Sequence, residues 1–277
     1  MSAKEALSTL YPDSSRRTLK SWIEKGRFSV DGRKLTRENE SLQEGQVLTS
    51  RDTFAPPRIP GIKIIYEDRH LIAIEKPAGL LSVPLDGENG SRHALGLLRE
   101  AFQSSGIFAV HRLDREASGV LLFARGKESE ERVKQLFEAH NLHRRYFAIV
   151  EGRMKEAQGT WRNHLSELPN YDVVETADGK EAISHFEVLR YSPKYTYLRV
   201  VLETGRKHQI RVHCQMAGHP VLGDLRYGAK ENPLRRLCLH AVHLELIHPF
   251  TLKTLRLASP LPPIFKKLGA KDILISP

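Results

Sequence analysis

The sequence predicts an α+β protein in which a mixed, largely antiparallel sheet with flanking helices follows a small α/β domain. Over residues 62–277, segments rich in β-branched and aromatic residues outnumber those with helical periodicity. A proline-rich stretch, residues 51–61, separates this part of the chain from residues 1–55, where basic residues gather. Because short turns join several of the expected strands, we predict mainly antiparallel pairing.

The first 55 residues begin with a predicted helix. Leu19, Trp22 and Ile23 have the i, i+3, i+4 spacing of one buried helix face. The serines at 14–15 are candidate N-caps, and Gly26 stands where a helix end favours a left-handed residue.

Two short strands should follow this helix. Phe28 and Val30 alternate with polar residues, and Asp31-Gly32 is a tight-turn signal. A further turn at Glu44-Gly45 is followed by Val47 and Leu48, which predict another strand.

A domain boundary is predicted in RDTFAPPRIPG, residues 51–61. Its three prolines remove backbone donors and favour an extended connection. We therefore expect one domain over residues 1–55, called the N-terminal module below, and a second over residues 62–277.

The second domain should contain a hairpin and five further strands. The hairpin comprises IKIIYED and HLIAIEKPAG, with Glu67-Asp68 at the turn. The other strands, marked by β-branched and aromatic residues, are GVLLFAR, RRYFAIVEG, ISHFEVLRY, YTYLRVVLETG and LHAVHLELI.

A helix is predicted for KESEERVKQLFEAH, residues 127–140. Val133, Leu136 and Phe137 would share one face. Glu130 and Lys134 have the i, i+4 spacing of a supporting charge pair.

The chain is basic, with 43 Lys and Arg against 33 Asp and Glu and a formal net charge of +10. This excess favours a polyanionic partner, nucleic acid ahead of a membrane surface, although a basic protein without such a partner has the same composition. Residues 16–37 carry eight basic and two acidic residues, the density of a phosphate-binding surface or of a solvated helix face. The basic residues are Arg16, Arg17, Lys20, Lys25, Arg27, Arg33, Lys34 and Arg37.

Cys214 and Cys238 are the only cysteines. Two cysteines in 277 residues form no disulfide framework, which favours a reducing compartment. No run approaches the length of apolar sequence that spans a bilayer, so we expect a cytoplasmic protein without a membrane partner.

One candidate for chemistry is the carboxylate in HRLDREASG, residues 111–119. Asp114 lies between Arg112 and Arg115, and nearby positive charge favours the ionised form that acts as a nucleophile or base. A local ion pair in a loop explains the same pattern.

Two further segments carry donors or an aromatic group. ETGRKHQIRVH, residues 203–213, follows a predicted strand and opens a helix, so Arg206, His208, Gln209 and Arg211 could bind phosphate or a carboxylate. Tyr146 lies in a strand behind two arginines, where core packing is the alternative role.

Five motifs occur in an order that resembles the RluA-type pseudouridine synthases over about residues 62–260. They are KPAGLLSVP (76–84), HRLDREASG (111–119), RRYFAIVEG (144–152), ETGRKHQIRVH (203–213) and LHAVHLEL (239–246). Ala117 departs from the family pattern, which usually has Thr there. The N-terminal module resembles the RNA-binding domain named after the fourth protein of the small ribosomal subunit, on SSRRTLKSWIEKGRFSVDGRKL and EGQVLTS.

The resemblance implies a pseudouridine-synthase fold and an enzyme that breaks the C1′–N1 bond of uridine, turns the uracil and rejoins it through C5. Asp114 would attack C1′ or take a proton at C2′. Arg211 would pair with Asp114 and aim it. Tyr146 would lie against the uracil and remove the C5 proton, directly or through water, although an ordinary tyrosine pKa near 10 makes it a poor base.

The resemblance also implies residues that bind the substrate. Arg112 would fill the gap left by the flipped nucleotide, Leu239 would wall the uracil pocket, and His111 would contact the substrate. In the N-terminal module, RNA would be bound by Arg16, Arg17, Lys20, Arg27, Arg33 and Lys34.

No cofactor or metal is expected. The reaction needs neither, the spacing of His208, His213, Cys214, Cys238 and His240 lacks the short pairs of zinc modules, and no phosphate-cradling glycine loop is present. The predicted partner is structured RNA, most of all large-subunit ribosomal RNA with transfer RNA as the alternative, bound by a monomer. A non-catalytic RNA-binding or ribosome-assembly factor is the rival class, and a nucleoside hydrolase a third.

Overall fold

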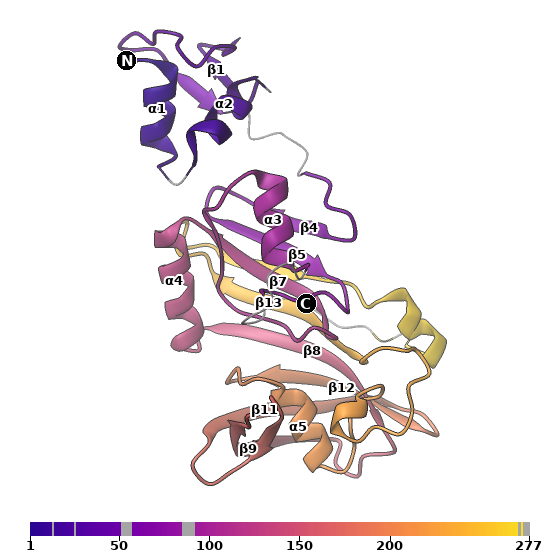
Figure 1. Cartoon of the computed structure of the whole chain (residues 1–277). Helices are drawn as coiled ribbons and strands as arrows, with labels where there is room; N and C mark the ends of the chain where they lie inside the picture. The colour runs from indigo at the N-terminus through magenta and orange to yellow at the C-terminus, as the bar shows by residue number, and fades with distance from the viewer. Residues whose placement is uncertain (13, 25, 51–56, 85–91, 271–272, 274–277) are drawn as a thin grey trace.

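The computed structural model describes residues 1–12, 14–24, 26–50, 57–84, 92–270 and 273. Lys25 and residues 51–56 of the predicted connection lie outside them. The described strands form a three-stranded sheet in the N-terminal module and an eleven-stranded sheet in the rest of the chain. Figure 1 shows the module at one end of the molecule, above the large sheet.

The small sheet has the strand order β2-β1-β3 and packs against two helices. Their shared core is formed by Ala3, Leu7, Leu19, Ile23, Phe28, Val30 and Leu35. The elements are α1 (Ala3–Leu10), α2 (Arg16–Glu24), β1 (Phe28–Val30), β2 (Arg33–Lys34) and β3 (Leu48–Ser50).

Several sequence predictions for this module are confirmed. The Ser15 hydroxyl accepts the N–H of Thr18 at 3.1 Å and caps α2, and Gly26 follows the helix with φ +70°. Asp31 and Gly32 form the turn between β1 and β2 with φ +48° and +80°. Helix α1 was not predicted, although its capping box of Ser2 and Glu5 is readable in the sequence.

The large sheet confirms the predicted strands and adds others. Its strands are β4 (Lys63–Glu67), β5 (Leu71–Lys76), β6 (Ile107–Ala109), β7 (Ser118–Arg125), β8 (Leu142–Glu151), β9 (Gln158–Glu167), β10 (Val173–Glu175), β11 (Lys180–Tyr191), β12 (Tyr195–Leu202), β13 (Leu239–Ile247) and β14 (Thr254–Ala258). Sequence reasoning did not identify β6, β9, β10 and β14, which are short or largely exposed.

The helices of this part are α3 (Ala94–Phe102), α4 (Lys127–Glu138) and α5 (Gln209–Met216), with 3₁₀ turns η1 (Leu225–Tyr227) and η2 (Pro263–Leu268). The predicted helix corresponds to α4, in which Val133 is buried and Glu130 pairs with Lys134 at 2.7 Å. Helix α3 was not predicted.

The mixed, largely antiparallel sheet confirms the predicted fold class. Its strand order is β10-β9-β11-β12-β8-β13-β7-β5-β4, with β14 on β13 and β6 on β7. Among the described pairs, β13 and β7 alone run parallel, whereas the rest are antiparallel. This parallel pair brings the start of β7 beside the start of β13, at the centre of the sheet.

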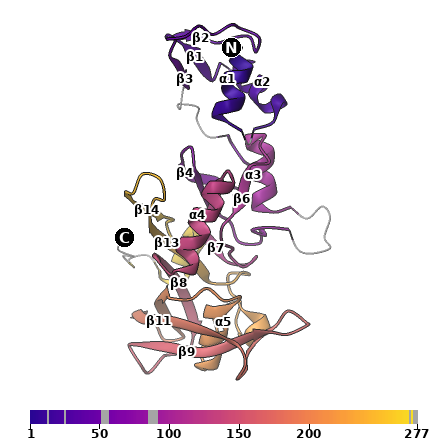
Figure 2. The same ribbon diagram turned by 90° about the vertical axis from the view of Figure 1, so that its left-hand side faces the viewer.

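Both faces of the sheet are covered around β5 and β7. Ile72 and Ile74 pack into the core cluster that contains Leu95 and Leu98 of α3. Their neighbours on β5 face a second cluster beneath α4. Because both faces are covered, β5 and β7 are buried along nearly their whole length. Figure 2 shows α4 lying over β7 and β8.

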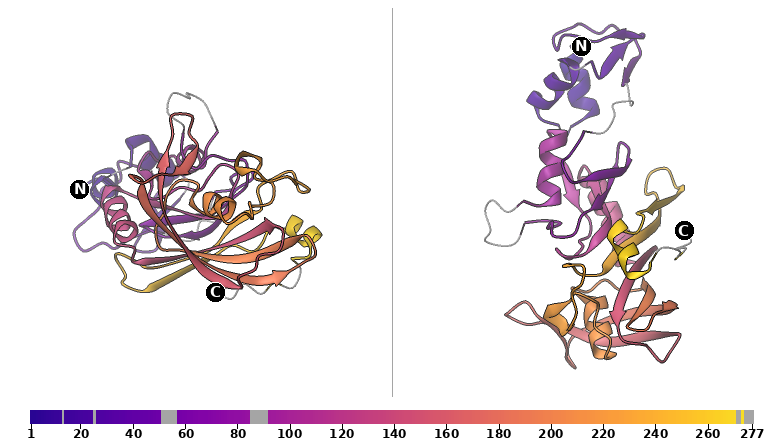
Figure 3. Two further views of the ribbon diagram at one scale, coloured as in Figure 1. Left: turned by 90° about the horizontal axis from the view of Figure 1, so that it is seen from below. Right: turned by 90° about the vertical axis from the view of Figure 1, so that its right-hand side faces the viewer.

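Contacts join the N-terminal module to the rest of the molecule. The Thr18 hydroxyl donates to the Gln103 carbonyl oxygen at 2.5 Å, just after α3, and Arg69 donates to the Leu10 carbonyl oxygen at 3.5 Å. The molecule is elongated, as Figure 3 shows, with α5, β9 and β11 at the end opposite the module.

Candidate active site

The loop that carries Asp114 enters β7 through a glycine with no room for a side chain. Gly119 has φ +119°, and a Cβ atom there would lie 2.2 Å from the Ala241 carbonyl oxygen. The close approach of β7 to β13 therefore requires glycine at this position. This close approach fixes the position at which the loop that carries Asp114 joins the sheet.

The segment 76–84 holds this loop in place. The Ser82 hydroxyl donates to the Leu113 carbonyl oxygen at 2.8 Å and accepts the Leu113 N–H at 3.0 Å. The buried Lys76 ammonium donates to the Arg115 carbonyl oxygen at 3.1 Å. Backbone hydrogen bonds thus fix the loop on both sides of Asp114.

Arg211 of α5 is the guanidinium that reaches Asp114. Its Nη1 lies 3.3 Å from Asp114 Oδ2, as the predicted pair requires. Its Nε and Nη2 donate to the two oxygens of the buried Asp224 at 2.7 Å each. Burial alone would lower the pKa of Arg211, but the ion pairs with Asp224 and Asp114 raise it, so the guanidinium stays charged.

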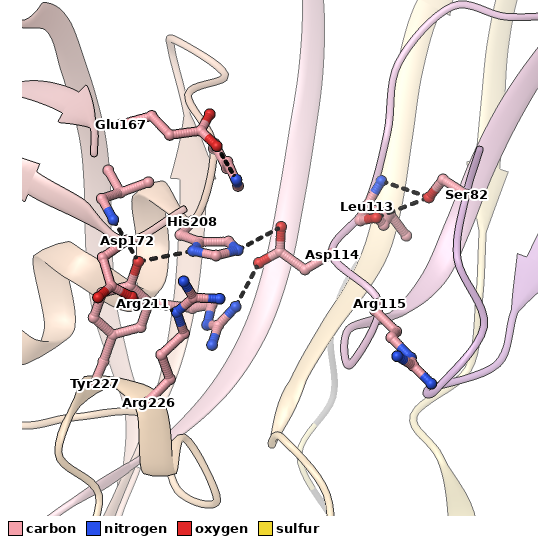
Figure 4. A network of polar contacts seen from close by, with 12 residues as sticks. Ser82, Leu113, Asp114, Arg115, Glu167, Asp172, His208, Arg211, Arg226 and Tyr227 are labelled. Carbon is pink, nitrogen blue, oxygen red and sulfur yellow. Dashed lines mark hydrogen bonds and ion pairs between the residues drawn. The ribbon is translucent and has the colours of Figure 1, made fainter. Parts of the chain in front are cut away.

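Arg112 and Arg115 flank Asp114 in the sequence, but in the structure neither forms an ion pair with its carboxylate. Arg115 turns away, and its Nε donates to the Gly79 carbonyl oxygen at 3.3 Å (Figure 4). Arg112 is exposed at the rim of the site. The expectation that these flanking arginines stabilise the carboxylate is corrected, because the guanidinium that contacts Asp114 comes from α5.

A histidine and a tyrosine complete the surroundings of Asp114. His208, the residue before α5, has Nε2 3.9 Å from Asp114 Oδ1 and Nδ1 2.7 Å from the Tyr227 hydroxyl. Burial and the nearby Arg211 lower the pKa of His208 to about 3, so it is neutral at physiological pH. Sequence reasoning missed Asp224 and Tyr227, which follow α5 in GDLRYG.

Asp114, His208 and Arg211 line a cavity of about 470 Å³. Its wall includes every catalytic and substrate-binding residue nominated from the sequence, namely His111, Arg112, Asp114, Tyr146, Arg211 and Leu239. Tyr146 comes from β8 and Leu239 from β13, and both are buried. Burial raises the pKa of the Tyr146 hydroxyl, with Arg144 acting in the opposite direction.

His111 and Arg144 belong to the wall of the cavity near α4. His111 stacks on Phe137 with ring centroids 4.8 Å apart, and its Nε2 accepts the Leu122 N–H at 2.9 Å. Burial lowers the pKa of His111 to about 3. Arg144 is buried, donates to the Glu203 carbonyl oxygen at 3.2 Å, and forms no ion pair with a carboxylate of the described residues.

The six basic residues of the N-terminal module that the sequence assigns to RNA binding differ in exposure and in their contacts. Arg16 and Arg17 are exposed. Lys20 lies 4.0 Å from Glu38, and Arg33 is paired with Glu40. The remaining two pack on the module itself, Arg27 with Cζ 3.9 Å above the Trp22 ring and Lys34 against Gly26.

Within the described ranges, no three His, Cys, Asp or Glu side chains are grouped to hold a metal ion. Cys214 and Cys238 are both free and buried. No helix in the described part of the chain has the length and apolar character to cross a membrane.

The arrangement can present a carboxylate to a planar ring. Asp114 is held through one oxygen, while Tyr146 and Leu239 supply the aromatic and aliphatic wall of the cavity. A carboxylate placed this way can act as a nucleophile or remove a proton. These are the operations that breaking and remaking a glycosidic bond requires.

Comparison with solved structures identifies the class of fold. The human protein called RNA Pseudouridylate Synthase Domain Containing 1 aligns with a TM-score of 0.61 at 23% identity, over 75% of this chain and 86% of that one. The sheet and helices are therefore those of the pseudouridine synthases.

Sequence comparisons identify the family. Residues 70–216 match the family model described as RNA pseudouridylate synthase. Ribosomal large subunit pseudouridine synthase D of Xanthomonas campestris is 33% identical over 95% of this chain and 86% of its own length. Dual-specificity RNA pseudouridine synthase RluA of Vibrio cholerae is 36% identical over 71% of this chain and 81% of its own length.

The chain belongs to the RNA pseudouridylate synthase family, among its RluA-type members. It is an RNA pseudouridine synthase, an isomerase whose substrate is RNA.

Proposed function

We propose that this enzyme converts uridine to pseudouridine in large-subunit ribosomal RNA, with Asp114 as the reacting carboxylate. The observation that carries the proposal is the Asp114 side chain at the cavity wall, 3.3 Å from the Arg211 guanidinium and with Tyr146 and Leu239 in the same wall. The ribosomal target is supported by relatives that are named for the large ribosomal subunit.

Each catalytic residue has a distinct role in this proposal. Asp114 attacks C1′ or takes the C2′ proton. Arg211 aims the carboxylate, because Asp224 holds the guanidinium by two further hydrogen bonds. Tyr146 lies against the uracil and relays the C5 proton. A water-mediated relay suits a hydroxyl whose pKa burial has raised better than direct abstraction does.

Three residues contact the RNA when the target nucleotide is flipped out. Arg112, exposed at the rim, occupies the space that the uridine leaves in the RNA. Leu239 walls the uracil on the side of β13. His111 acts through its position in the wall, since its Nε2 is already bonded to the backbone of β7.

The chain has two domains in this proposal, residues 1–55 for RNA binding and residues 62–277 for catalysis. The separate sheet and core of the N-terminal module support the division, and its order of helix, glycine, strand and turn supports the resemblance to the fourth small-subunit protein. RNA phosphates are bound by the basic residues of the module, above all the exposed Arg16 and Arg17. The enzyme acts as a monomer in the cytoplasm without a cofactor, and its free cysteines accord with a reducing compartment.

The test is tritium release from RNA labelled at C5 of uridine. Wild type should release tritium, whereas Asp114→Asn should release none. The exposed Asp178→Asn makes the same chemical change away from the site and should retain activity. An active Asp114→Asn protein would exclude that carboxylate from the reaction.

The RNA target is tested with unmodified transcripts. Large-subunit ribosomal RNA should release tritium with wild type, and mapping would then give the position. Release from transfer RNA alone would overturn the ribosomal assignment but keep the isomerase. No release from either transcript would favour a non-catalytic RNA-binding role.

A further inference from the structure

His208 lies between Asp114 and Tyr227 and has a defined environment on both ring nitrogens. Its Nδ1 is 2.7 Å from the Tyr227 hydroxyl, and its Nε2 is 3.9 Å from Asp114 Oδ1. Figure 4 shows the imidazole between the two, on the side of Asp114 that Arg211 does not occupy. The His208 side chain is only 9% exposed.

The hydrogen bonds of the Tyr227 hydroxyl bear on which ring nitrogen of His208 carries the proton. Its oxygen accepts the Val173 N–H at 3.0 Å, so its own proton is free to be donated. In the described part of the chain, the other hydrogen bond of this hydroxyl is the one to His208 Nδ1. If Tyr227 donates this proton, Nδ1 is the acceptor and the single ring proton lies on Nε2, which faces Asp114.

In that tautomer, His208 faces the carboxylate as a neutral donor. Burial lowers its pKa to about 3, and the neighbouring cations Arg211, Lys207 and Arg226 act in the same direction. A second full positive charge at Asp114 would stabilise the carboxylate further and weaken it as a nucleophile or base. A neutral N–H orients an oxygen at a smaller cost in reactivity.

We propose that His208 is a positioning residue for the isomerisation, a Tyr227-held Nε2–H donor that aligns Asp114 Oδ1 while Arg211 aligns Oδ2. The inference rests on the proposed role of Asp114 as the reacting carboxylate. At 3.9 Å the contact is too long for a hydrogen bond, and Arg211 to Asp114 at 3.3 Å is also long. The proposal requires both contacts to shorten when uridine enters the cavity, as catalytic hydrogen bonds often do on substrate binding.

Tyr227 supports both partners of Asp114. Besides its hydrogen bond to His208, its ring lies under the Arg211 guanidinium, with Cζ 4.9 Å from the ring centroid. The Val173 N–H that fixes the hydroxyl comes from β10. Strand β10, the turn η1 and helix α5 thus meet behind the carboxylate.

Two substitutions at His208 separate the two ring nitrogens. Gln places its amide N–H near the position of Nε2 and keeps a donor toward Asp114. Asn places its amide near the position of Nδ1 and keeps only a partner for Tyr227. Both remove the ring, so a merely structural role would give the two variants similar losses.

The measurement is single-turnover tritium release at saturating enzyme, together with the Kd for RNA. His208→Asn should lower the rate constant about 10- to 100-fold, the loss of one hydrogen bond to a charged group, with Kd unchanged. His208→Gln should stay within about fivefold of wild type, because its donor is retained. Equal losses in both variants, or a loss confined to Kd, would overturn the proposal.

Tyr227→Phe removes the hydroxyl that sets the tautomer. Its rate constant should fall about 3- to 10-fold without a change in Kd, a smaller loss because His208 itself remains. Tyr195→Phe is the matched control, since that hydroxyl bonds to Glu231 at an exposed position. An unaltered Tyr227→Phe rate constant would contradict the role of the hydroxyl.

The tautomer is also measured without turnover, by ¹⁵N NMR of the imidazoles in the full chain at pH 7. The His208 signal, assigned by its absence in His208→Gln, should show a protonated Nε2 and an unprotonated Nδ1. A protonated Nδ1 would overturn the proposal whatever the RNA substrate proves to be. Absence of tritium release from wild type, in contrast, would refute the proposed target and leave the NMR result to decide on His208.

Discussion

Arg211 connects two carboxylates of different kinds. Asp114 is partly exposed at the cavity, whereas Asp224 is buried with 2% of its surface exposed. The shorter contacts go to Asp224, which makes this aspartate the structural anchor of the guanidinium. The Arg211–Asp114 contact therefore depends on a second ion pair, the buried one between Arg211 and Asp224.

Arg211→Met should abolish turnover and also destabilise the fold. Removing the guanidinium leaves Asp224 buried without its partner, a loss of about 3–5 kcal/mol in the free energy of unfolding. Denaturant titration measures the stability, and tritium release with RNA Kd measures the function. Kd should stay close to wild type because the guanidinium acts on Asp114 rather than on RNA phosphate.

A double-mutant cycle with Asp224→Asn provides the control. The loss in Arg211→Met/Asp224→Asn should be smaller than the sum of the two single losses, because the unpaired charge is removed. An additive result would show that the two side chains are not coupled. A fully active Arg211→Met protein would exclude the residue from the mechanism.

Gly119 offers a second prediction at the scale of one residue. Gly119→Ala should lower the free energy of unfolding far more than Gly218→Ala, although both have positive φ, +119° and +79°. Only Gly119 has backbone atoms where a Cβ would stand, since Gly218 has nothing within 4 Å. The positive φ costs alanine about 1–2 kcal/mol at both positions. Equal losses of unfolding free energy in the two variants, measured by denaturant titration, would contradict a steric clash at Gly119.

At the scale of elements, the N-terminal module has more basic residues in its sequence than basic side chains available to bind RNA, because several contact other groups of the module. Eight basic residues lie in residues 16–37, yet Lys20 and Arg33 contact glutamates of the same module. Arg27 rests on an aromatic ring. Arg16 and Arg17, exposed at the start of α2, are the better candidates for phosphate contacts.

Neutralising these two arginines should weaken RNA binding and reduce its salt dependence. For Arg16→Gln/Arg17→Gln, the slope of log K against log salt should become shallower by about 0.7–0.9 for each phosphate that the protein no longer neutralises. Arg162→Gln is the matched control, and its slope should change little because this guanidinium lies outside the module and is paired with Glu181 at 2.7 Å.

Removal of residues 1–58 should have the larger effect in the same titration. Without the basic module, RNA affinity falls and its salt dependence flattens. An unchanged slope in the truncated protein would show that RNA is anchored elsewhere. The hydrogen bond from Thr18 to Gln103 would then serve only to dock the module.

At the scale of the whole molecule, buried neutral histidines make stability depend on pH. Burial lowers the pKa of His111 and His208 to about 3 and of His213 and His240 to about 4. In the unfolded chain these imidazoles bind protons below an ordinary pKa near 6.5. The stability they contribute is present above that pH and is lost as the pH falls from about 6.5 toward about 4 for His213 and His240 and toward about 3 for His111 and His208.

The free energy of unfolding should therefore fall between pH 7 and pH 5. Each histidine that stays neutral in the folded state contributes up to about 1.4 kcal/mol per pH unit in this window. Urea titrations at the two pH values measure the change. A stability that is constant or rises toward pH 5 would contradict neutral burial of these four imidazoles.

The amino-acid sequence alone predicted the central strands, helix α4 and the residues that line the cavity. Alternating and β-branched segments predicted the strands that build the centre of the sheet, and i, i+4 spacing predicted α4. Strand β9 was not readable because its residues are largely exposed, and β10 because it has only three residues. Helix α3 was also missed, although its buried side chains complete one face of the core.

The tertiary structure decided which charges meet. Arg112 and Arg115 adjoin Asp114 in the chain, but successive side chains of a loop point in different directions, and the partner is Arg211, 97 residues away. Asp224 and Tyr227 became part of the site only because the chain after α5 folds back beneath it. Sequence patterns record local periodicity, whereas ion pairs and tautomers depend on distances between segments that only the packed sheet brings together.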